Sequence, residues 1–376
     1  MDSLIYWVWL GNLPGIFSNK ITALMEHFES IEEIYKAADY KNIPGISRGD
    51  ALILGSKDLS HAKEIIEKIN KLGAYILTYD DIDYPDELRK IDSPPYVLYL
   101  KGEKLSWDRL FAIGVVGTRR CTAYGAKAAD NLCFDLAARG ITIVSGMARG
   151  IDSAAARAAL RAGGKTIAVL GSGIDVIYPP ENRELMEEIE KSGTVMTEYP
   201  PGSQPMAHHF PERNRIISGL SKGVLVIEAP LKSGALITAN YALEAGRDLF
   251  AVPGEIFKDN SKGTNLLIKQ GARIVSSAMD IIEEYPADIE KLVPAEEKPE
   301  EPVNNIRRIT IDDEKYQALD KKEQSVISLL IEKNMHIDDI SVHTGIDIGE
   351  LNAMLPMLEM LGLIRKLPGD NYKLEV

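Results

Sequence analysis

The sequence predicts an α/β protein with a Rossmann-like, mostly parallel sheet as its core domain. An N-terminal helical domain and a C-terminal winged-helix domain are predicted to flank this core. Short apolar segments alternate with helical patterns between residues 111 and 254, and this alternation is typical of a parallel sheet covered on both faces. A repeated Pro-Gly turn precedes that region, and a segment rich in Pro, Glu and Lys follows it. The 376 residues allow two or three domains of about 100–200 residues each.

Residues 1–70 are predicted to form a helix-hairpin-helix (SAM-like) domain. Residues 13–16 (LPGI) and 43–46 (IPGI) each form an apolar–Pro–Gly–apolar turn before a helical pattern. In such a turn the glycine allows a ligand to come close to the backbone, and the N-terminus of the next helix can hold a phosphate. Only Lys20, Arg48 and Lys57 add positive charge nearby. Non-specific DNA contact and a helical domain without a ligand therefore both stay open.

Residues 71–285 are predicted to form the Rossmann-like domain. Two edge strands are expected between residues 74 and 102, and six further strands follow at 111–117, 141–146, 166–171, 194–199, 224–229 and 248–254. In such a sheet, ligands bind beyond the carboxyl ends of the strands.

Residues 286–312 are predicted to be a flexible, charged linker, and residues 313–376 a winged helix. Three helical patterns at 321–334, 336–345 and 347–362 precede a two-stranded wing with a Pro-Gly-Asp turn. The third helix has no Lys or Arg, and Pro356 is expected to kink it. Helices that read DNA carry such side chains, so protein contacts or accessory positioning are predicted ahead of duplex reading.

The composition is that of a soluble globular protein, with 45% hydrophobic and 26% charged residues. The net charge of −13 argues against a grip on nucleic acid over the whole surface, but it permits a local basic pocket. The N-terminus lacks the features of a signal peptide or membrane helix, which predicts a cytoplasmic protein without membrane contact. Cys121 and Cys133 lie in one helical stretch, too far apart for a disulfide, and no metal or cofactor site is predicted.

Loops rich in Gly and Ser follow several predicted strands, and they should all lie on one rim of the sheet. Each loop leads into a helix whose free N–H groups can hold an anion, and several such sites fit a polyanion better than one nucleotide. The predicted binding residues in these loops are Gly117, Arg119, Ser145, Gly146, Arg149, Gly150, Gly171, Gly173, Lys232 and Ser233.

Two segments resemble nucleotide-binding motifs but match them only in part. Residues 164–166 (GKT) resemble the end of a P-loop, but they precede a strand, and Ala159 stands where the leading glycine should be. A dinucleotide fingerprint beginning at Gly171 would need its third glycine at Val176, so NAD is not expected. Lys165 can contact a phosphate, or it can be a solvated lysine at a strand start.

Residues 208–215 (HHFPERNR) are predicted to form a short turn on the same rim. Arg213 and Arg215 can bind phosphates bidentately, and Phe210 can stack on an unpaired base. In the alternative interpretation, Phe210 belongs to the core and the arginines pair with Glu198 or Glu212.

No catalytic set stands out. The chain has no G-x-S-x-G elbow, and Asp152, Asp175 and Glu228 near strand ends have no histidine in a matching loop. A protein without catalytic residues is therefore predicted.

Several long motifs resemble the DNA-processing protein A family (DprA, also called Smf), most densely between residues 77 and 276. They are GTR at 117–119, SGMARGIDSAAARAAL at 145–160, TIAVLGSGIDVIYPPEN at 166–182, TEYPPG at 197–202, FPERNRIISGLS at 210–221, VIEAPLKSGALITANYALEAGRDLFAVPG at 226–254 and GTNLLIKQGA at 263–272.

The resemblance implies a non-catalytic protein that binds single-stranded DNA in a basic pocket of the Rossmann-like domain. It implies a homodimer through that domain, and loading of the RecA recombinase onto incoming DNA during natural transformation. By motif, Arg119 should hold a phosphate and Lys165 should contact DNA. Ser145, Gly146 and Gly150 should form a phosphate loop, while Phe210, Arg213, Asn214 and Arg215 should line the pocket. The dimer contact is expected at Leu267, Ile268 and Ile274.

Two other functions stay as alternatives. One is a nucleotide-processing enzyme of the phosphoribohydrolase kind, but its P-G-G-x-G-T-x-x-E motif is replaced by KSGALITAN at 232–240. The other is a duplex-binding regulator that acts through the winged helix.

Overall fold

The computed structural model describes residues 2–292, 319–332, 335–367 and 371–374. The chain divides into two compact units, Met1–Val293 and Pro294–Val376. Residues 286–292, predicted as linker, instead form helix α14 (Pro286–Leu292) at the end of the first unit. The rest of the predicted linker lies outside the described residues.

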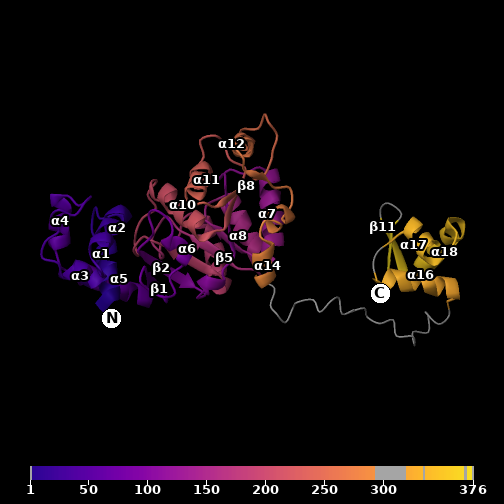
Figure 1. Cartoon of the computed structure of the whole chain (residues 1–376), viewed down its shortest axis with the longest axis horizontal. Coiled ribbons are helices and arrows are strands. Elements are labelled where there is room, and N and C mark those ends of the chain that lie inside the picture. Colours follow the sequence, from indigo (N-terminus) through magenta and orange to yellow (C-terminus); the bar gives the residue numbers. More distant parts are fainter. Residues whose placement is uncertain (1, 293–318, 333–334, 368–370, 375–376) are drawn as a thin grey trace. The chain divides into compact units, whose positions relative to one another are not determined.

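The first unit begins with a helical part that packs beside strands β1 and β2 of the sheet (Figure 1). Its helices are α1 (Asp2–Gly11), α2 (Ser18–His27), α3 (Ile31–Lys36), α4 (Arg48–Gly55) and α5 (Ser60–Lys71). The Trp7 indole stacks on Tyr96 with ring centroids 5.6 Å apart and donates to Asp80 at 2.9 Å. Helical part and sheet therefore share one hydrophobic core.

Both predicted Pro-Gly turns are present before α2 and α4. Gly15 and Gly45 have φ of +77° and +83°, which glycine adopts without steric cost. The N-terminus of α4 already has an anion of its own, because Ser47 and Asp50 form a capping box there. Lys20 pairs with Asp50 at 2.6 Å and holds the pKa of this carboxyl at about 2. The positive charge of Lys20 is thus balanced inside the protein.

A nine-stranded sheet forms the centre of the unit, in the order β1-β2-β6-β5-β4-β3-β7-β8-β9. Strands β1 and β2 are antiparallel, β2 is antiparallel to β6, and all other neighbours are parallel. The strands are β1 (Tyr75–Thr78), β2 (Val97–Gly102), β3 (Ala112–Gly117), β4 (Thr142–Ser145), β5 (Thr166–Val169), β6 (Thr194–Thr197), β7 (Gly223–Ile227), β8 (Asp248–Ala251) and β9 (Arg273–Ile274). The predicted strands are confirmed, and β9 is an additional short one.

Helices cover both faces of the sheet because alternate strand residues point to opposite sides. In β3, Ile113 and Val115 pack with α7 (Ala123–Ala137) and α8 (Ile151–Arg161), whereas Val116 packs with α10 (His209–Leu220) and α11 (Gly234–Glu244). The remaining helices of the unit are α6 (Asp86–Arg89), η1 (Trp107–Arg109), η2 (Pro180–Asn182), α9 (Arg183–Ser192), α12 (Asp259–Lys269) and α13 (Met279–Ile282).

The second unit is a winged helix with its own core of Val326, Ile340, Leu351 and Leu355. Its helices are α16 (Lys321–Glu332), α17 (Ile337–Thr344) and α18 (Ile348–Met360), and its strands are β10 (Met335–His336), β11 (Ile364–Leu367) and β12 (Asn371–Leu374). The predicted wing is present as β11 and β12, and β10 adds a third strand. The predicted Pro-Gly-Asp turn lies outside the described residues. No helix in the described part of the chain has the length and apolar character needed to cross a membrane.

Candidate nucleic-acid interface

The topology places a ligand site where the order of the strands reverses. From β3 the chain continues through β4, β5 and β6 on one side, and then through β7 and β8 on the other. In open α/β sheets, ligands bind beyond the carboxyl ends of strands at such a switch point. Residues 118–122 follow β3 and residues 228–233 follow β7, so these two loops adjoin at the switch point. These two loops and the loops that follow the other parallel strands lie at the carboxyl edge of the sheet. We call this edge the carboxyl rim.

Phe210 lies on the carboxyl rim as part of a helix. The predicted turn at 208–215 is wrong, because α10 begins at His209. Pro211 is compatible with a first helical turn, where its missing N–H would have no partner. The half-buried Phe210 ring has the Arg119 guanidinium 5.0 Å from its centroid and the Tyr178 ring 5.4 Å away. An arginine and an aromatic ring are thus already paired at the rim.

A second pair of rings lies next to Phe210. Tyr199 and His209 stack with centroids 3.9 Å apart, and His209 Nδ1 donates to the Gly171 carbonyl at 3.1 Å. Neither Tyr178 nor Tyr199 was predicted, since both come from loops that only the fold brings to α10. The rim therefore carries several aromatic side chains, whereas the sequence analysis indicated only Phe210.

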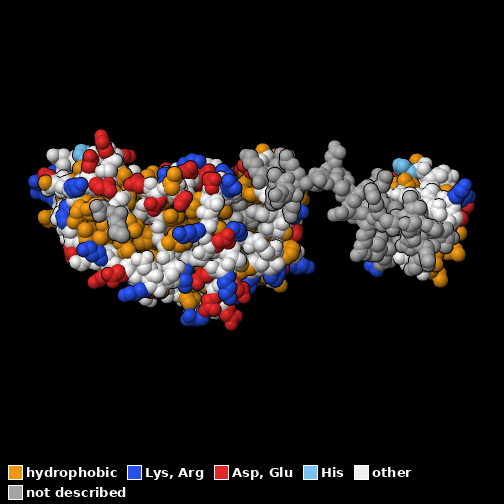
Figure 2. Space-filling model, turned by 90° about the horizontal axis from the view of Figure 1, so that it is seen from below, with side chains coloured by type: hydrophobic (Ala, Val, Ile, Leu, Met, Phe, Trp, Pro, Cys, Tyr) orange, Lys and Arg blue, Asp and Glu red, His pale blue; other side chains and the backbone are white. Residues whose placement is uncertain are grey.

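Three cations of the rim are open to solvent. Arg119, Arg120 and Lys232 are exposed, and within the described part of the chain none of them forms an ion pair. Arg120 was not predicted, although its place directly after Arg119 in the GTRR sequence was a usable signal. Figure 2 shows that Lys and Arg mix with Asp and Glu on the face of the first unit visible there. The positive charge available to a ligand on the rim is consequently local.

Arg213 is buried and cannot bind a phosphate from solution. It is 3% exposed, and its guanidinium donates to the Gly146 carbonyl at 2.8 Å and to Asn214 Oδ1 at 3.2 Å. Burial lowers its pKa to about 10, and burial also raises the pKa of the facing Asp152. Arg213 still stays cationic at neutral pH. Asn214 also donates to the Gly234 carbonyl at 3.4 Å, so it joins α10 to the start of α11.

Arg215 pairs with Glu198, as the alternative interpretation of this stretch expected. The two guanidinium–carboxylate contacts are 2.5 and 2.6 Å long, and the side chains are only 12% and 18% exposed. Its Nε also donates to the Ser93 carbonyl at 2.8 Å. The predicted phosphate contact is therefore corrected, because the donors of Arg215 already have protein acceptors.

Two further cations of the predicted set have acidic partners. Arg149 lies on the rim but pairs with Glu181, where both side chains are about half exposed. Lys165 precedes β5 and so lies at the opposite edge of the sheet, where it pairs with Glu103 at 2.5 Å. The prediction that Lys165 lies in the DNA pocket is therefore wrong, because the residue is at the edge of the sheet away from the carboxyl rim.

The small residues of the rim serve the packing of the protein itself. Ser145 is 2% exposed and its hydroxyl donates to the Val115 carbonyl at 2.7 Å, so it is not available to a phosphate. A side chain at Gly146 would collide with the Arg213 guanidinium, and one at Gly171 would press on the Phe210 ring. At the other predicted glycines, Gly117, Gly150 and Gly173, a side chain would collide with the protein backbone.

The helix starts along the rim are partly closed by internal acceptors. Thr122 caps α7, Ser233 caps α11, and the Asp152 carboxylate accepts from the Ala148 N–H at 3.3 Å beside the start of α8. These oxygens take N–H groups that we expected to be free for anions. Exposed side chains, more than helix N-termini, are thus the positive groups that the rim presents.

The three carboxylates considered as an acid/base set have separate partners. Asp152 faces Arg213, Asp175 pairs with Lys68 at 2.8 Å, and Glu228 accepts hydrogen bonds from Thr122. Burial and the charge of Glu228 raise the pKa of the Cys121 thiol, which disfavours the reactive thiolate. The described residues hold no cluster of His, Cys, Asp and Glu suited to a metal ion.

The residues predicted for the dimer contact differ in exposure. Leu267 is 5% exposed and belongs to the core, so it cannot form an exposed contact. Ile268 is partly buried, whereas Ile274 on the edge strand β9 is 55% exposed. Leu266 and Leu243 are also exposed, at 37% and 59%. Exposed apolar side chains are thus present on α11, α12 and β9, but only part of the predicted set is among them.

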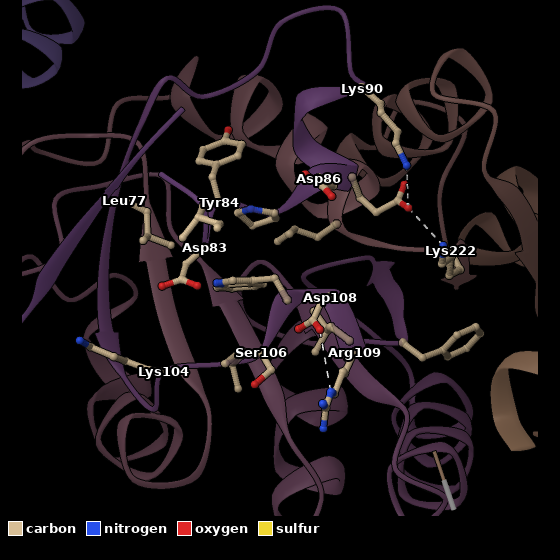
Figure 3. A pocket seen from close by; sticks show the side chains of 18 of the residues that line it. Leu77, Asp83, Tyr84, Asp86, Lys90, Lys104, Ser106, Asp108, Arg109 and Lys222 are labelled. Carbon is tan, nitrogen blue, oxygen red and sulfur yellow. Dashed lines mark hydrogen bonds and ion pairs between the residues drawn. The ribbon is translucent and has the colours of Figure 1, made fainter. Parts of the chain in front are cut away.

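A large cavity lies at the other edge of the sheet. It has a volume of about 1240 Å³, and its walls include Phe111 and Lys222, which precede β3 and β7. In Figure 3, Lys90 and Lys222 point toward one carboxylate, which belongs to Glu87. Burial would raise the pKa of Glu87, but Arg247 and the two lysines hold it at about 2. No predicted binding residue lines this cavity.

The third helix of the winged-helix unit is acidic and apolar on its exposed side. Met357 and Met360 of α18 are 60% and 90% exposed, and the described helix has no Lys or Arg. The helix continues through Pro356 to Met360. This surface agrees with the expectation that the domain does not read a duplex through this helix.

Comparisons with known proteins match both units. The profile described as DNA recombination-mediator protein A matches residues 75–286, and that of the DprA winged helix domain matches residues 312–370. Protein Smf of Synechocystis is 35% identical, with 98% of both chains covered. DNA processing protein DprA of Streptococcus pneumoniae is 39% identical over 74% of this chain and 98% of its own.

Two solved structures share the fold. The DNA processing protein A structure from Streptococcus pneumoniae has a TM-score of 0.63 at 35% identity, covering 76% of this chain and 98% of the other. The structure of DNA processing protein A from Helicobacter pylori, which was solved to study its single-stranded DNA binding mode, has a TM-score of 0.52 at 31% identity. The match covers 57% of this chain and 96% of the other. The chain therefore belongs to the DprA/Smf family of DNA-processing, recombination-mediator proteins.

Proposed function

We propose that the protein binds single-stranded DNA along the carboxyl rim and acts as a non-catalytic recombination mediator. The observation that carries the proposal is the pair of Arg119 and Phe210 at the switch point. A base that stacks on Phe210 would bring its phosphates within reach of Arg119, Arg120 and Lys232. Unpaired bases offer a ring face for stacking, whereas a duplex hides it, so this combination favours single strands.

Assembly and partner belong to the same proposal. The surface around α12 and β9 is proposed to join two copies of the chain, with Ile274 and Ile268 in the contact. In this assembly the protein loads a RecA-type recombinase onto incoming DNA, as the family resemblance implies. The exposed apolar side chains Leu266 on α12 and Ile274 on β9 support the dimer, because burying them against a second copy would remove apolar surface from water.

Arg119→Ala should weaken binding of a single-stranded oligonucleotide and flatten its salt dependence. Each lost phosphate contact lowers the slope of log Kobs against log salt by about 0.7 for single strands. Arg109→Ala is the matched control, because Arg109 is 87% exposed and lies beyond the opposite edge of the sheet. A slope that stays equal to that of the wild type in Arg119→Ala would remove Arg119 from the interface.

Removing the winged-helix unit after Val293 should leave the affinity for single-stranded DNA within about threefold, because all proposed contacts lie in the first unit. Fluorescence anisotropy on the full and shortened chains measures this. Complete loss of binding by a shortened chain that is still folded would move the site into the second unit.

Ile274→Glu should shift the protein toward monomer, since a charged side chain cannot be buried in an apolar contact without a large desolvation cost. Sedimentation velocity over a range of concentrations gives the proportion of dimer. Ile82→Glu is the control, because Ile82 is 97% exposed on a different surface. If both variants dimerise as the wild type does, the proposed contact is wrong.

A further inference from the structure

We propose that Glu228 is a positioning residue of the DNA interface, which holds the loop of residues 118–122 with Arg119 and Arg120 in place. The inference rests on the proposed function, since it concerns how that site is built. Glu228 directly follows β7 at the switch point, and it is 5% exposed. Within the described residues, no lysine or arginine forms an ion pair with it, so its charge has no cationic partner there.

Hydrogen-bond donors from two segments stabilise this carboxylate. The Thr122 N–H donates to Oε2 at 2.8 Å, and the Thr122 hydroxyl donates to Oε1. Asn260 of α12 donates to Oε2 at 3.4 Å and to the Arg120 carbonyl at 3.0 Å. The carboxylate also lies at the N-terminus of α7, beside Gly125, where a helix favours negative charge.

The backbone around Glu228 supports the same loop. The Thr118 N–H donates to the Glu228 carbonyl at 2.8 Å. Glu228 has φ of +51°, a left-handed conformation that is rare for a residue with a side chain. Such conformations persist where surrounding contacts determine them, often at functional sites. Here the contacts of the carboxylate hold Glu228 in this conformation.

Both ends of the cationic loop are therefore fixed from the β7 side. Thr118 is bound through the Glu228 backbone and Thr122 through its side chain, while Arg119 and Arg120 lie between them. On the other side, the Ile151 N–H at the start of α8 donates to the Thr118 carbonyl at 3.3 Å. Loss of the carboxylate would free the end of the loop that carries both arginines.

Two possible roles of Glu228 predict opposite effects of Glu228→Gln on DNA binding. If charge alone mattered, Glu228→Gln would remove a negative charge near phosphates and strengthen binding. If Glu228 positions the arginines, the variant should bind single-stranded DNA about five- to tenfold more weakly, with a salt slope lower by about 0.7–1.4 for one or two lost contacts. The amide cannot accept from all the donors that face the carboxylate, because one of its two ends is itself a donor.

Glu181→Gln is the matched control. It makes the same chemical change on the same rim, but Glu181 is exposed and only neutralises Arg149. This variant should bind DNA as tightly as the wild type or more tightly. Thr122→Val is a second test without a charge change, and it should weaken binding in the same direction as Glu228→Gln.

A double-mutant cycle shows whether Glu228 acts through the arginines. In the Arg119→Ala, Arg120→Ala background, Glu228→Gln should have no further effect on the affinity or the slope. An equal additional loss in that background, or binding by Glu228→Gln that matches or exceeds the wild type, would overturn the inference. If the wild type itself fails to bind single-stranded DNA, it is the proposed function that fails.

Discussion

Phe210→Ala should weaken the binding of single-stranded DNA by about 1–3 kcal/mol for each base that stacks on the ring, which is about 5- to 150-fold. The structure gives two reasons for a large effect. The ring is half-buried against Tyr178 and Gly171, so it is held in place before a base arrives. It also lies 5.0 Å from the Arg119 guanidinium, which would lose its aromatic contact.

The test is a binding curve at one fixed salt concentration, with Phe210→Trp as the conservative variant. Tryptophan keeps an aromatic face, so much of the affinity should return. Phe134→Ala controls for the loss of an aromatic side chain, because Phe134 is 39% exposed near the end of α7 away from the rim. If Phe210→Ala binds as tightly as the wild type, Phe210 is a packing residue only.

Arg215→Met should lower the free energy of unfolding by about 3 kcal/mol, at the low end of the range for breaking a buried ion pair. The variant leaves the Glu198 carboxylate, which is only 18% exposed, without its guanidinium partner. Chemical denaturation measures the loss. This expectation differs from a role in phosphate binding, which would weaken DNA affinity and leave stability almost unchanged.

The double variant Arg215→Met, Glu198→Met separates the two roles. Replacing a whole buried pair by apolar side chains is often neutral, so the double variant should recover most of the lost stability. It should also keep the salt slope of the wild type, because Arg215 makes no proposed phosphate contact. A slope lower by about 0.7 in the folded double variant would show that Arg215 contacts a phosphate after all.

The strands and the rim could be predicted because their signals are local in the sequence. Each buried parallel strand is a short apolar run, and the loop that follows it must lie at the carboxyl edge. The segment at 208–215 was expected as a turn, but proline also fits the first turn of a helix, and Pro211 lies in the first turn of α10. Leu267 was expected in the dimer contact, whereas the structure buries it in the core one helical turn after Thr264.

The partners of Lys165 and Glu228 could not be predicted, because they come from distant parts of the chain. Glu103 reaches Lys165 from 62 positions away, and Thr122 reaches Glu228 from 106 positions away. Arg215 and Glu198 are closer in sequence. Even so, only the fold shows that the Arg215 guanidinium donates to Glu198 and is not left free for a phosphate. A count of arginines in a motif thus overestimates the charge available to a ligand.

The most direct test of the central claim is a salt titration of the wild-type protein with one oligonucleotide, single-stranded and as its duplex. The account predicts tighter binding of the single strand at every salt concentration, with log Kobs falling linearly with log salt. Equal or tighter binding of the duplex, or an affinity for the single strand that does not change with salt, would contradict it.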